Sequence, residues 1–69
     1  MKNIKIIEEV LKLYNIAYLL CNDEDGEYIL IADNLTDIVF ETLNIRAKEL
    51  EFNYVIKPHH INSIIIKII

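Results

Sequence analysis

The first part of the chain mixes apolar and charged residues at helical spacing. Within residues 3–14 the apolar residues form one stripe, which includes Ile4, Ile7, Leu11 and Tyr14. Charged residues occupy the other side, where Glu8 and Lys12 are spaced as an i,i+4 pair. We therefore predict a helix over residues 3–14, with Asn3 as its N-cap and Asn15 in the left-handed conformation that ends it.

Two apolar stretches follow, and a short polar segment separates them. Residues 16–22 (IAYLLCN) and 27–33 (EYILIAD) are rich in apolar and aromatic residues, which is typical of strands. The polar segment contains the dipeptide Asp25-Gly26, and glycine readily adopts the positive φ of a tight turn. The pattern therefore predicts an antiparallel hairpin.

Both strands of this hairpin are apolar on both faces. A two-residue loop would pair Leu20 with Ile31 and Cys21 with Leu30. Each face then requires a cover, either from a helix or from another subunit.

The second half of the chain has a similar order of patterns. Residues 35–50 place apolar side chains on one helical stripe, so we predict a second helix. Residues 52–57 alternate like a half-buried strand, which Pro58 is expected to end. Residues 63–69 (SIIIKII) are β-branched and predict a strand that must be paired within a sheet or across a dimer.

These elements define a fold class. The predicted order is α-β-β-α-β-β within a single domain, residues 1–69. We expect a small α+β domain in which one antiparallel sheet packs with two helices. The excess of isoleucine and the doubly apolar strands also predict a homodimer, which a monomer at high micromolar concentration would disprove.

Charge is distributed unevenly along the chain. The net charge is −4, and no lysine or arginine occurs between Leu13 and Ile45. The acidic residues of this segment are Asp23, Glu24, Asp25, Glu27, Asp33, Asp37 and Glu41. We interpret them as a surface that binds a basic protein partner, because charge steers association. The alternative is a solvated face that keeps a small apolar protein soluble. Direct nucleic-acid binding is not expected, because it requires a basic face.

The composition also bears on location. Cys21 is the only cysteine, so the chain cannot form an internal disulfide, and a reducing cytoplasm is expected. The longest uncharged run, Leu13 to Asn22, is shorter than the roughly 20 residues of a membrane span. Charged residues interrupt the N-terminal apolar residues, so we expect neither a signal peptide nor membrane contact.

The acidic turn matches a calcium loop only in part. With Gly26 at the sixth position of an EF-hand loop, Asp23 and Asp25 fall at the third and fifth positions. Cys21 then stands at the first position and Ala32 at the twelfth, where a bidentate glutamate is required. We expect no bound metal and no cofactor.

His59 and His60 are the other candidates for chemistry. They are expected in the loop after Pro58, and adjacent residues of an extended segment point to opposite sides. Zinc would need further ligands, and only Cys21 remains as a histidine or cysteine. Cys21 itself is expected to be a small buried residue, because nothing near it in the sequence would lower its pKa.

One known family has a similar hairpin. The segment EDGEYILIAD followed by a helix resembles the HicB-type antitoxins, which carry a strand, an Asp-Gly-x-Tyr turn, a second strand and a helix. The resemblance depends on Asp25, Gly26 and Tyr28. The family's Gly-Cys and acidic-cap pattern after the second strand is absent, because this chain has NLTDIVF there, and membership is not inferred.

Three functions are compatible with these patterns. The first is a small acidic, non-enzymatic protein-binding module, such as an inhibitor or antitoxin-like protein of a phage or mobile element. The second is an assembly subunit that associates with itself through the isoleucine-rich strand 63–69. The third is a small hydrolase or nuclease that uses His59 and His60. We rank them in that order, because no catalytic motif with a required spacing occurs in the chain.

Overall fold

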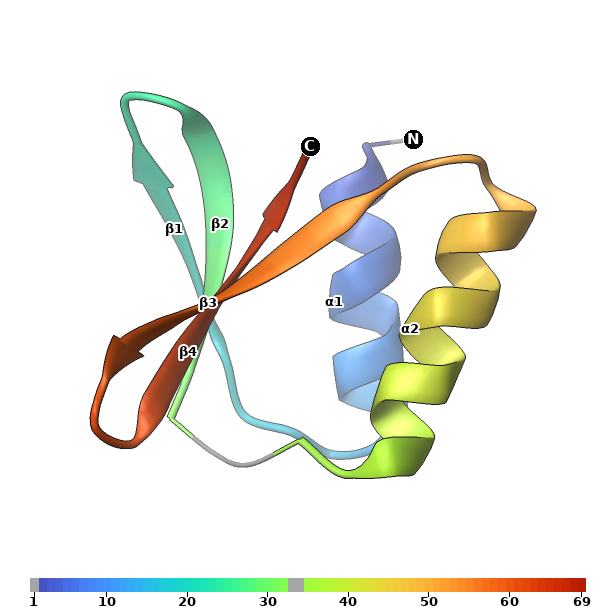
Figure 1. The fold of residues 1–69 in the computed structure, drawn as a ribbon, viewed down its shortest axis with the longest axis horizontal. Helices are drawn as coiled ribbons and strands as arrows, with labels where there is room; N and C mark the ends of the chain where they lie inside the picture. Colours follow the sequence, from blue (N-terminus) through green and yellow to red (C-terminus); the bar gives the residue numbers. More distant parts are fainter. Residues whose placement is uncertain (1, 33–34) are drawn as a thin grey trace.

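The computed structural model describes residues 2–32 and 35–69. It contains the helices and strands α1 (Asn3–Leu13), β1 (Leu19–Asp23), β2 (Gly26–Ile31), α2 (Asp37–Glu49), β3 (Tyr54–His60) and β4 (Ser63–Ile68). This order confirms the predicted α-β-β-α-β-β fold (Figure 1). In the part of the chain that the structure describes, no helix has the length and apolar character needed to cross a membrane.

The four strands form one antiparallel sheet in the order β1-β2-β4-β3. The isoleucine-rich strand β4 lies inside the sheet, between β2 and β3. The expectation that this segment is paired within a sheet is therefore confirmed. The outer strands are β1 and β3, and each belongs to a hairpin, so the two hairpins meet at β2 and β4.

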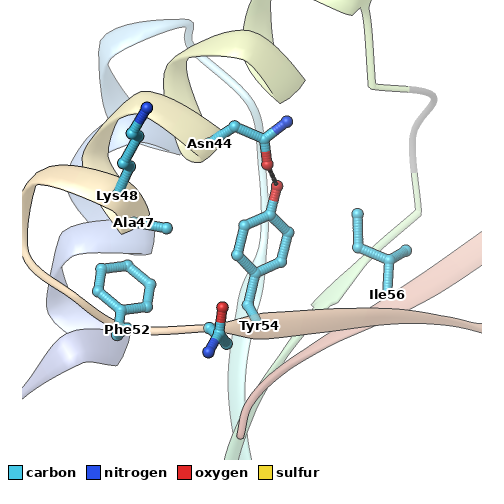
Figure 2. Close-up of a pocket in the computed structure, with 7 residues that line it drawn as sticks. Asn44, Ala47, Lys48, Phe52, Tyr54 and Ile56 are labelled. Atoms are coloured by element: carbon cyan, nitrogen blue, oxygen red, sulfur yellow. Dashed lines mark hydrogen bonds between the residues drawn. The ribbon is translucent and has the colours of Figure 1, made fainter.

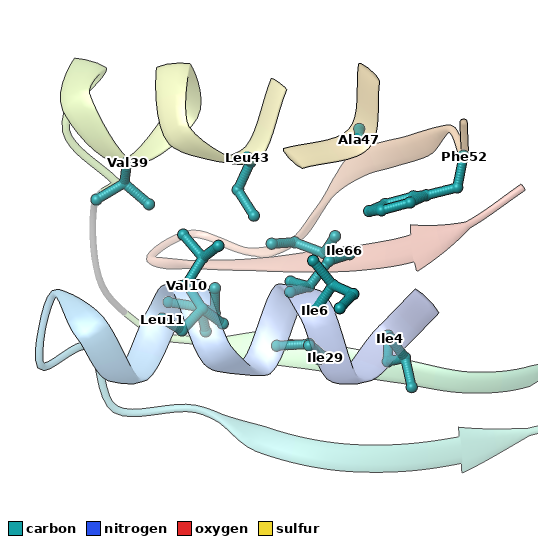
Figure 3. Packing of buried hydrophobic residues seen from close by; sticks show 12 residues of the cluster. Ile4, Ile6, Val10, Leu11, Ile29, Val39, Leu43, Ala47, Phe52 and Ile66 are labelled. Atoms are coloured by element: carbon teal, nitrogen blue, oxygen red, sulfur yellow. The ribbon is translucent and has the colours of Figure 1, made fainter. Parts of the chain in front are cut away.

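Both helices cover the same face of the sheet (Figure 1). The apolar side chains between the two layers form the core, which consists of Ile4, Ile6, Ile7, Val10, Leu11, Ile29, Ile31, Val39, Leu43, Ala47, Phe52 and Ile66 (Figure 3). Because side chains alternate along a strand, Ile29 and Ile31 of β2 point to the helices while Tyr28 and Leu30 point to the other face. The core therefore uses one face of the sheet.

The two helices end in the same way. Asn15 has a φ of +56°, as predicted, and Glu51 has the same value after α2. In each case the next residue returns a hydrogen bond to the helix: the backbone N–H of Ile16 donates to Leu11, and that of Phe52 donates to Ala47. The predicted N-cap was wrong by one residue. Asn3 is the first helical residue, and Lys2 occupies the cap without a side-chain bond.

The β1–β2 hairpin confirms the predicted turn but corrects its register. Leu20 pairs with Ile29 rather than with Ile31, because Glu24 and Asp25 form the centre of the turn and Gly26 begins β2 with a φ of +116°. The Asp23 carboxylate stabilises this turn by accepting a hydrogen bond from the backbone N–H of Asp25 at 2.9 Å. The register differs by two residues, so every side chain stays on its predicted face.

The end of β3 also differs from the prediction. Pro58 does not end the strand, which continues through His59 to His60 before the turn at residues 61–62. Proline is tolerated here because β3 is an edge strand, where a backbone N–H can be lost. A register shift between Pro58 and His60 interrupts the regular ladder with β4.

Candidate interaction surface

The acidic residues of the base-free segment divide into separate groups. Four of them lie on the β1–β2 hairpin: Asp23, Glu24, Asp25 and Glu27. Asp37 and Glu41 lie in the first half of α2, which begins at the far end of the molecule from the hairpin tip (Figure 1). Asp33 lies outside the described residues. The fold therefore brings the four hairpin carboxylates together and keeps the α2 pair apart from them.

Lysines from distant parts of the chain partly neutralise the hairpin. The Lys67 ammonium lies 2.7 Å from Asp23 Oδ2 and 3.7 Å from Asp25 Oδ2. The Lys2 ammonium lies 3.3 Å from Glu27 Oε1. The hydrogen bond from Lys67 lowers the pKa of Asp23, and the same bond raises the pKa of Lys67. These contacts hold the hairpin to β4 and to the start of α1.

The tip of the hairpin keeps an excess of negative charge. Residues 22–26 are exposed, and the Asp25 side chain is 85% accessible. Glu24 is an exposed carboxylate at the same tip. Four carboxylates with two nearby lysines leave a negative surface, which favours a basic partner.

Within residues 2–32 and 35–69, no helix covers the second face of the sheet. Its apolar side chains come from all four strands: Leu19, Cys21, Tyr28, Leu30, Val55 and Ile65. Lys67 crosses this face, with its ammonium 5.6 Å from the centre of the Tyr28 ring, which is within the range of a cation–π contact. The sequence predicted that both faces of the hairpin require a cover. The two helices cover one face, and the structure does not test what covers the other.

The outer edge of β1 is also open. Among the residues that the structure describes, β1 pairs only with β2. Leu19 is 63% exposed on the uncovered face, and Leu20 is 41% exposed on the helix side. Apolar side chains therefore flank an edge whose outward backbone groups have no strand partner.

The histidines lie at the opposite end of the sheet from the acidic hairpin (Figure 1). The His59 and His60 rings lie 4.2 Å apart between centroids, with an angle of 60° between their planes. The prediction that they point apart was wrong, because the irregularity at Pro58 and His60 breaks the alternation. Cys21 lies on the other edge strand, so the fold does not bring it to the histidines.

Among the described residues, 2–32 and 35–69, no group of three histidine, cysteine, aspartate or glutamate side chains is arranged to hold a metal ion. His59 and His60 are exposed, and the backbone N–H of His60 donates to Ser63 Oγ at 3.1 Å. These contacts stabilise the β3–β4 turn.

A buried carboxylate was missed by the sequence reasoning. Glu8 was expected on the charged side of α1, but only 8% of it is exposed. Its Oε1 accepts a hydrogen bond from the Tyr18 hydroxyl at 2.8 Å, and its Oε2 has no partner within the described residues. Burial raises the pKa of Tyr18, and the hydrogen bond to Glu8 adds to this shift. The spacing along the helix could have predicted this burial, because Glu8 lies four residues after Ile4 and therefore on the same side of the helix as the apolar stripe.

A hollow of about 540 Å³ lies between α2 and β3 (Figure 2). It is lined by Asn44, Ala47, Lys48, Phe52, Asn53, Tyr54 and Ile56. The Tyr54 side chain crosses this hollow, and its hydroxyl donates a hydrogen bond to Asn44 Oδ1 at 2.5 Å. Its lining has one charged group, Lys48, and therefore no pair of acid and base for catalysis.

The residues that resemble the HicB-type hairpin have structural roles here. Asp25 lies at the turn, Gly26 supplies the positive φ, and Tyr28 lies on the uncovered face beneath Lys67. Comparison of the sequence with protein-family models and with curated proteins finds no match.

Proposed function

We propose that this chain is a non-enzymatic protein-binding module that presents the β1–β2 hairpin to a basic surface of its partner. The observation that carries the proposal is the concentration of carboxylates at an exposed hairpin tip, with lysines that neutralise only part of the charge. Such a surface accelerates encounter with a basic site and fixes the orientation of the complex.

An inhibitory role follows from this chemistry. Exposed carboxylates on a narrow hairpin can occupy a basic cleft that otherwise binds phosphates. A small inhibitor or antitoxin-like protein of a phage or mobile element would use the hairpin in this way, for instance against a nuclease. The site residues of this proposal are Asp23, Glu24, Asp25 and Glu27. The α2 residues Asp37 and Glu41 contribute only to the overall electrostatic field of the protein.

Affinity capture from a host lysate, at low and high salt, tests the proposal. The decisive comparison is between the variant with Glu24→Lys and Asp25→Lys and the variant with Asp37→Lys and Glu41→Lys. Both change the net charge by the same amount, but only the first removes the net negative charge of the hairpin. We expect one basic partner, released at high salt and lost in the hairpin variant. Equal loss in both variants, or a partner retained at high salt, would contradict the proposal.

The uncovered sheet face supports a second candidate function, an assembly subunit that associates with itself. Both edges of β4 are used within the chain, so self-association would occur through the face that carries Ile65 and Leu30. Sedimentation velocity at high micromolar concentration should then show a dimer, and Ile65→Glu should dissociate it. A monomer at that concentration would contradict this second candidate.

A further inference from the structure

The open edge of β1 suggests how a partner could bind. A sheet edge presents a row of backbone N–H and C=O groups that another strand can pair with. Within the described residues, β1 has a partner on one side only, and its five residues carry neither proline nor lysine. The other edge, β3, contains Lys57 and Pro58 and an irregular register. Proteins use these features to prevent strand addition, so β1 is the edge that remains competent for pairing.

The side chains of β1 provide apolar contacts on both sides of this edge. Leu19 and Cys21 lie on the uncovered face, where Leu19 is 63% exposed. Leu20 lies on the helix face and is 41% exposed. An added strand could therefore bury apolar side chains on either face while its backbone pairs with β1.

Charge determines the kind of strand that fits this edge. The apolar part of β1 is followed, after Asn22, by Asp23, Glu24 and Asp25 at the tip. A second copy of β1, paired antiparallel, would place its own apolar start beside these carboxylates and would add no positive charge to that of Lys67. A segment with lysine or arginine at that position neutralises them. Charge complementarity therefore favours a foreign basic strand.

We infer that the partner contributes an extended segment that adds to the free edge of β1 as an antiparallel fifth strand, with basic residues beside the hairpin tip. Because β1 runs from Leu19 towards Asp23, an antiparallel segment has its N-terminal end beside Asp23. Its arginines or lysines therefore precede its alternating apolar residues. This inference rests on the proposed function, because it names the partner of the same hairpin.

A designed peptide tests the inference directly. The probe is a fluorescently labelled peptide of about ten residues, with two arginines followed by alternating valine and threonine, a pattern that suits strand addition. A second peptide has the same composition with the arginines at the C-terminal end. We expect the first to bind at least about tenfold more tightly in fluorescence anisotropy, since only its charges meet the carboxylates. Equal binding of the two peptides, or no binding of the first at millimolar concentration, overturns the inference.

The backbone contribution requires its own control. Two further peptides carry N-methyl groups at every second residue, one peptide for each of the two alternating sets. Only one set faces β1, so one of these peptides should lose binding and the other should retain it. Hydrogen exchange should also show slower exchange for outward-facing backbone amides within Leu19–Asp23 when the first peptide is bound. Equal behaviour of the two N-methylated peptides, or unchanged exchange in β1, overturns strand addition.

A matched pair of protein variants separates the edge from the charge. Leu20→Lys places a protecting lysine beside the free edge, and Leu50→Lys makes the same change at a leucine of similar exposure, 45% against 41%, after α2. We expect Leu20→Lys to weaken peptide binding at least about tenfold and Leu50→Lys to leave it unchanged. Circular dichroism of both variants establishes that they are folded.

The outcomes distinguish the two levels of the proposal. If Glu24→Lys with Asp25→Lys abolishes capture of the partner while Leu20→Lys has no effect, the acidic hairpin binds without strand addition and the inference fails alone. If capture does not depend on the hairpin charges, the proposed function fails as well. Sedimentation that shows a dimer broken by Leu20→Lys would replace the foreign strand with a second copy of this chain.

Discussion

The two hairpins of this sheet occupy equivalent positions but differ at their outer edges and tips. The β1–β2 hairpin has an unprotected outer strand and a tip of carboxylates around Gly26. The β3–β4 hairpin has Lys57 and Pro58 in its outer strand and His60 and Ile61 at its tip. The β3 edge therefore carries a lysine, a proline and an irregular register, whereas β1 carries none of these three and has Asp23 at its end as its one charged residue.

Because of this difference, β1 is the less protected of the two sheet edges. A small sheet with two edges is at risk of aggregation on both sides. Protection of β3 shows that the chain can block an edge, whereas β1 combines exposed leucines with nearby carboxylates. The carboxylates would repel those of a second copy in a parallel pairing, and in the proposed complex a basic strand occupies the edge.

The largest expected effect compares isoleucines that lie in one row of the sheet. Ile29 of β2 is fully buried against the helices, whereas Ile56 of the edge strand β3 is half-buried. Ile29→Ala should lower the free energy of unfolding by about 2–5 kcal/mol, and Ile56→Ala should cost clearly less. Urea denaturation of both variants measures the difference. Equal losses would show that the two hairpins are anchored equally in the core.

The next effect compares the tyrosines that connect each edge to a helix. Tyr18, just before β1, bonds to the buried Glu8, whereas Tyr54 in β3 bonds to the exposed Asn44. Tyr18→Phe removes the hydrogen bond to a buried carboxylate and should cost about 1–3 kcal/mol. Tyr54→Phe should cost about 0.5–1.5 kcal/mol, because water can replace the hydroxyl at Asn44. A larger loss of stability for Tyr54→Phe than for Tyr18→Phe in thermal denaturation would contradict the expectation that the bond to Glu8 contributes more.

A smaller effect compares the two hairpin tips. Gly26 has a φ of +116°, and a Cβ built on it meets nothing within 4 Å, so the strain of Gly26→Ala arises from the backbone alone. The substitution should lower stability by at least about 1 kcal/mol. Ile61 is fully exposed at the other tip, so Ile61→Ala should stay within about 0.5 kcal/mol of the parent protein. Equal stability of the two variants would contradict a conformational requirement for glycine.

The smallest effect concerns the pH dependence of the acidic hairpin. Lys67 holds the pKa of Asp23 below its ordinary value of 3.8. A lowered folded pKa means that this contribution to stability is complete above the ordinary value and is lost as the pH falls through the folded pKa. In an NMR titration, Lys67→Met should raise the pKa of Asp23, whereas Lys57→Met on the other hairpin should leave it unchanged. An unchanged Asp23 titration in Lys67→Met would disprove the pairing.

Much of the fold could be predicted from local patterns. Helical spacing located α1 and α2, β-branched and alternating residues located the strands, and Asp25-Gly26 located the first turn. The errors have specific causes. The turn used Glu24 and Asp25 at its centre because the Asp23 carboxylate accepts a local hydrogen bond. Pro58 was read as a terminator because its position on an edge strand, where proline is tolerated, depends on strand order.

The candidate site was predicted only as a list of charges. The base-free segment identified the hairpin carboxylates, but the sequence did not separate them from Asp37 and Glu41. Nor did it pair Lys67 with Asp23, which lie 44 positions apart in the sequence. Such contacts between distant residues depend on how the strands pair, which local patterns do not encode.

The sequence by itself determined the elements, their order and the acidic character of the hairpin, because periodicity, turn residues and charge are local properties. Only the tertiary structure decided which strands are edges, which sheet face remains uncovered and why Glu8 is buried. The physical reason is that strand order and helix placement result from burying apolar surface between segments far apart in the chain. The free edge of β1, on which the proposed recognition depends, exists because the β3–β4 hairpin pairs with β2 and not with β1.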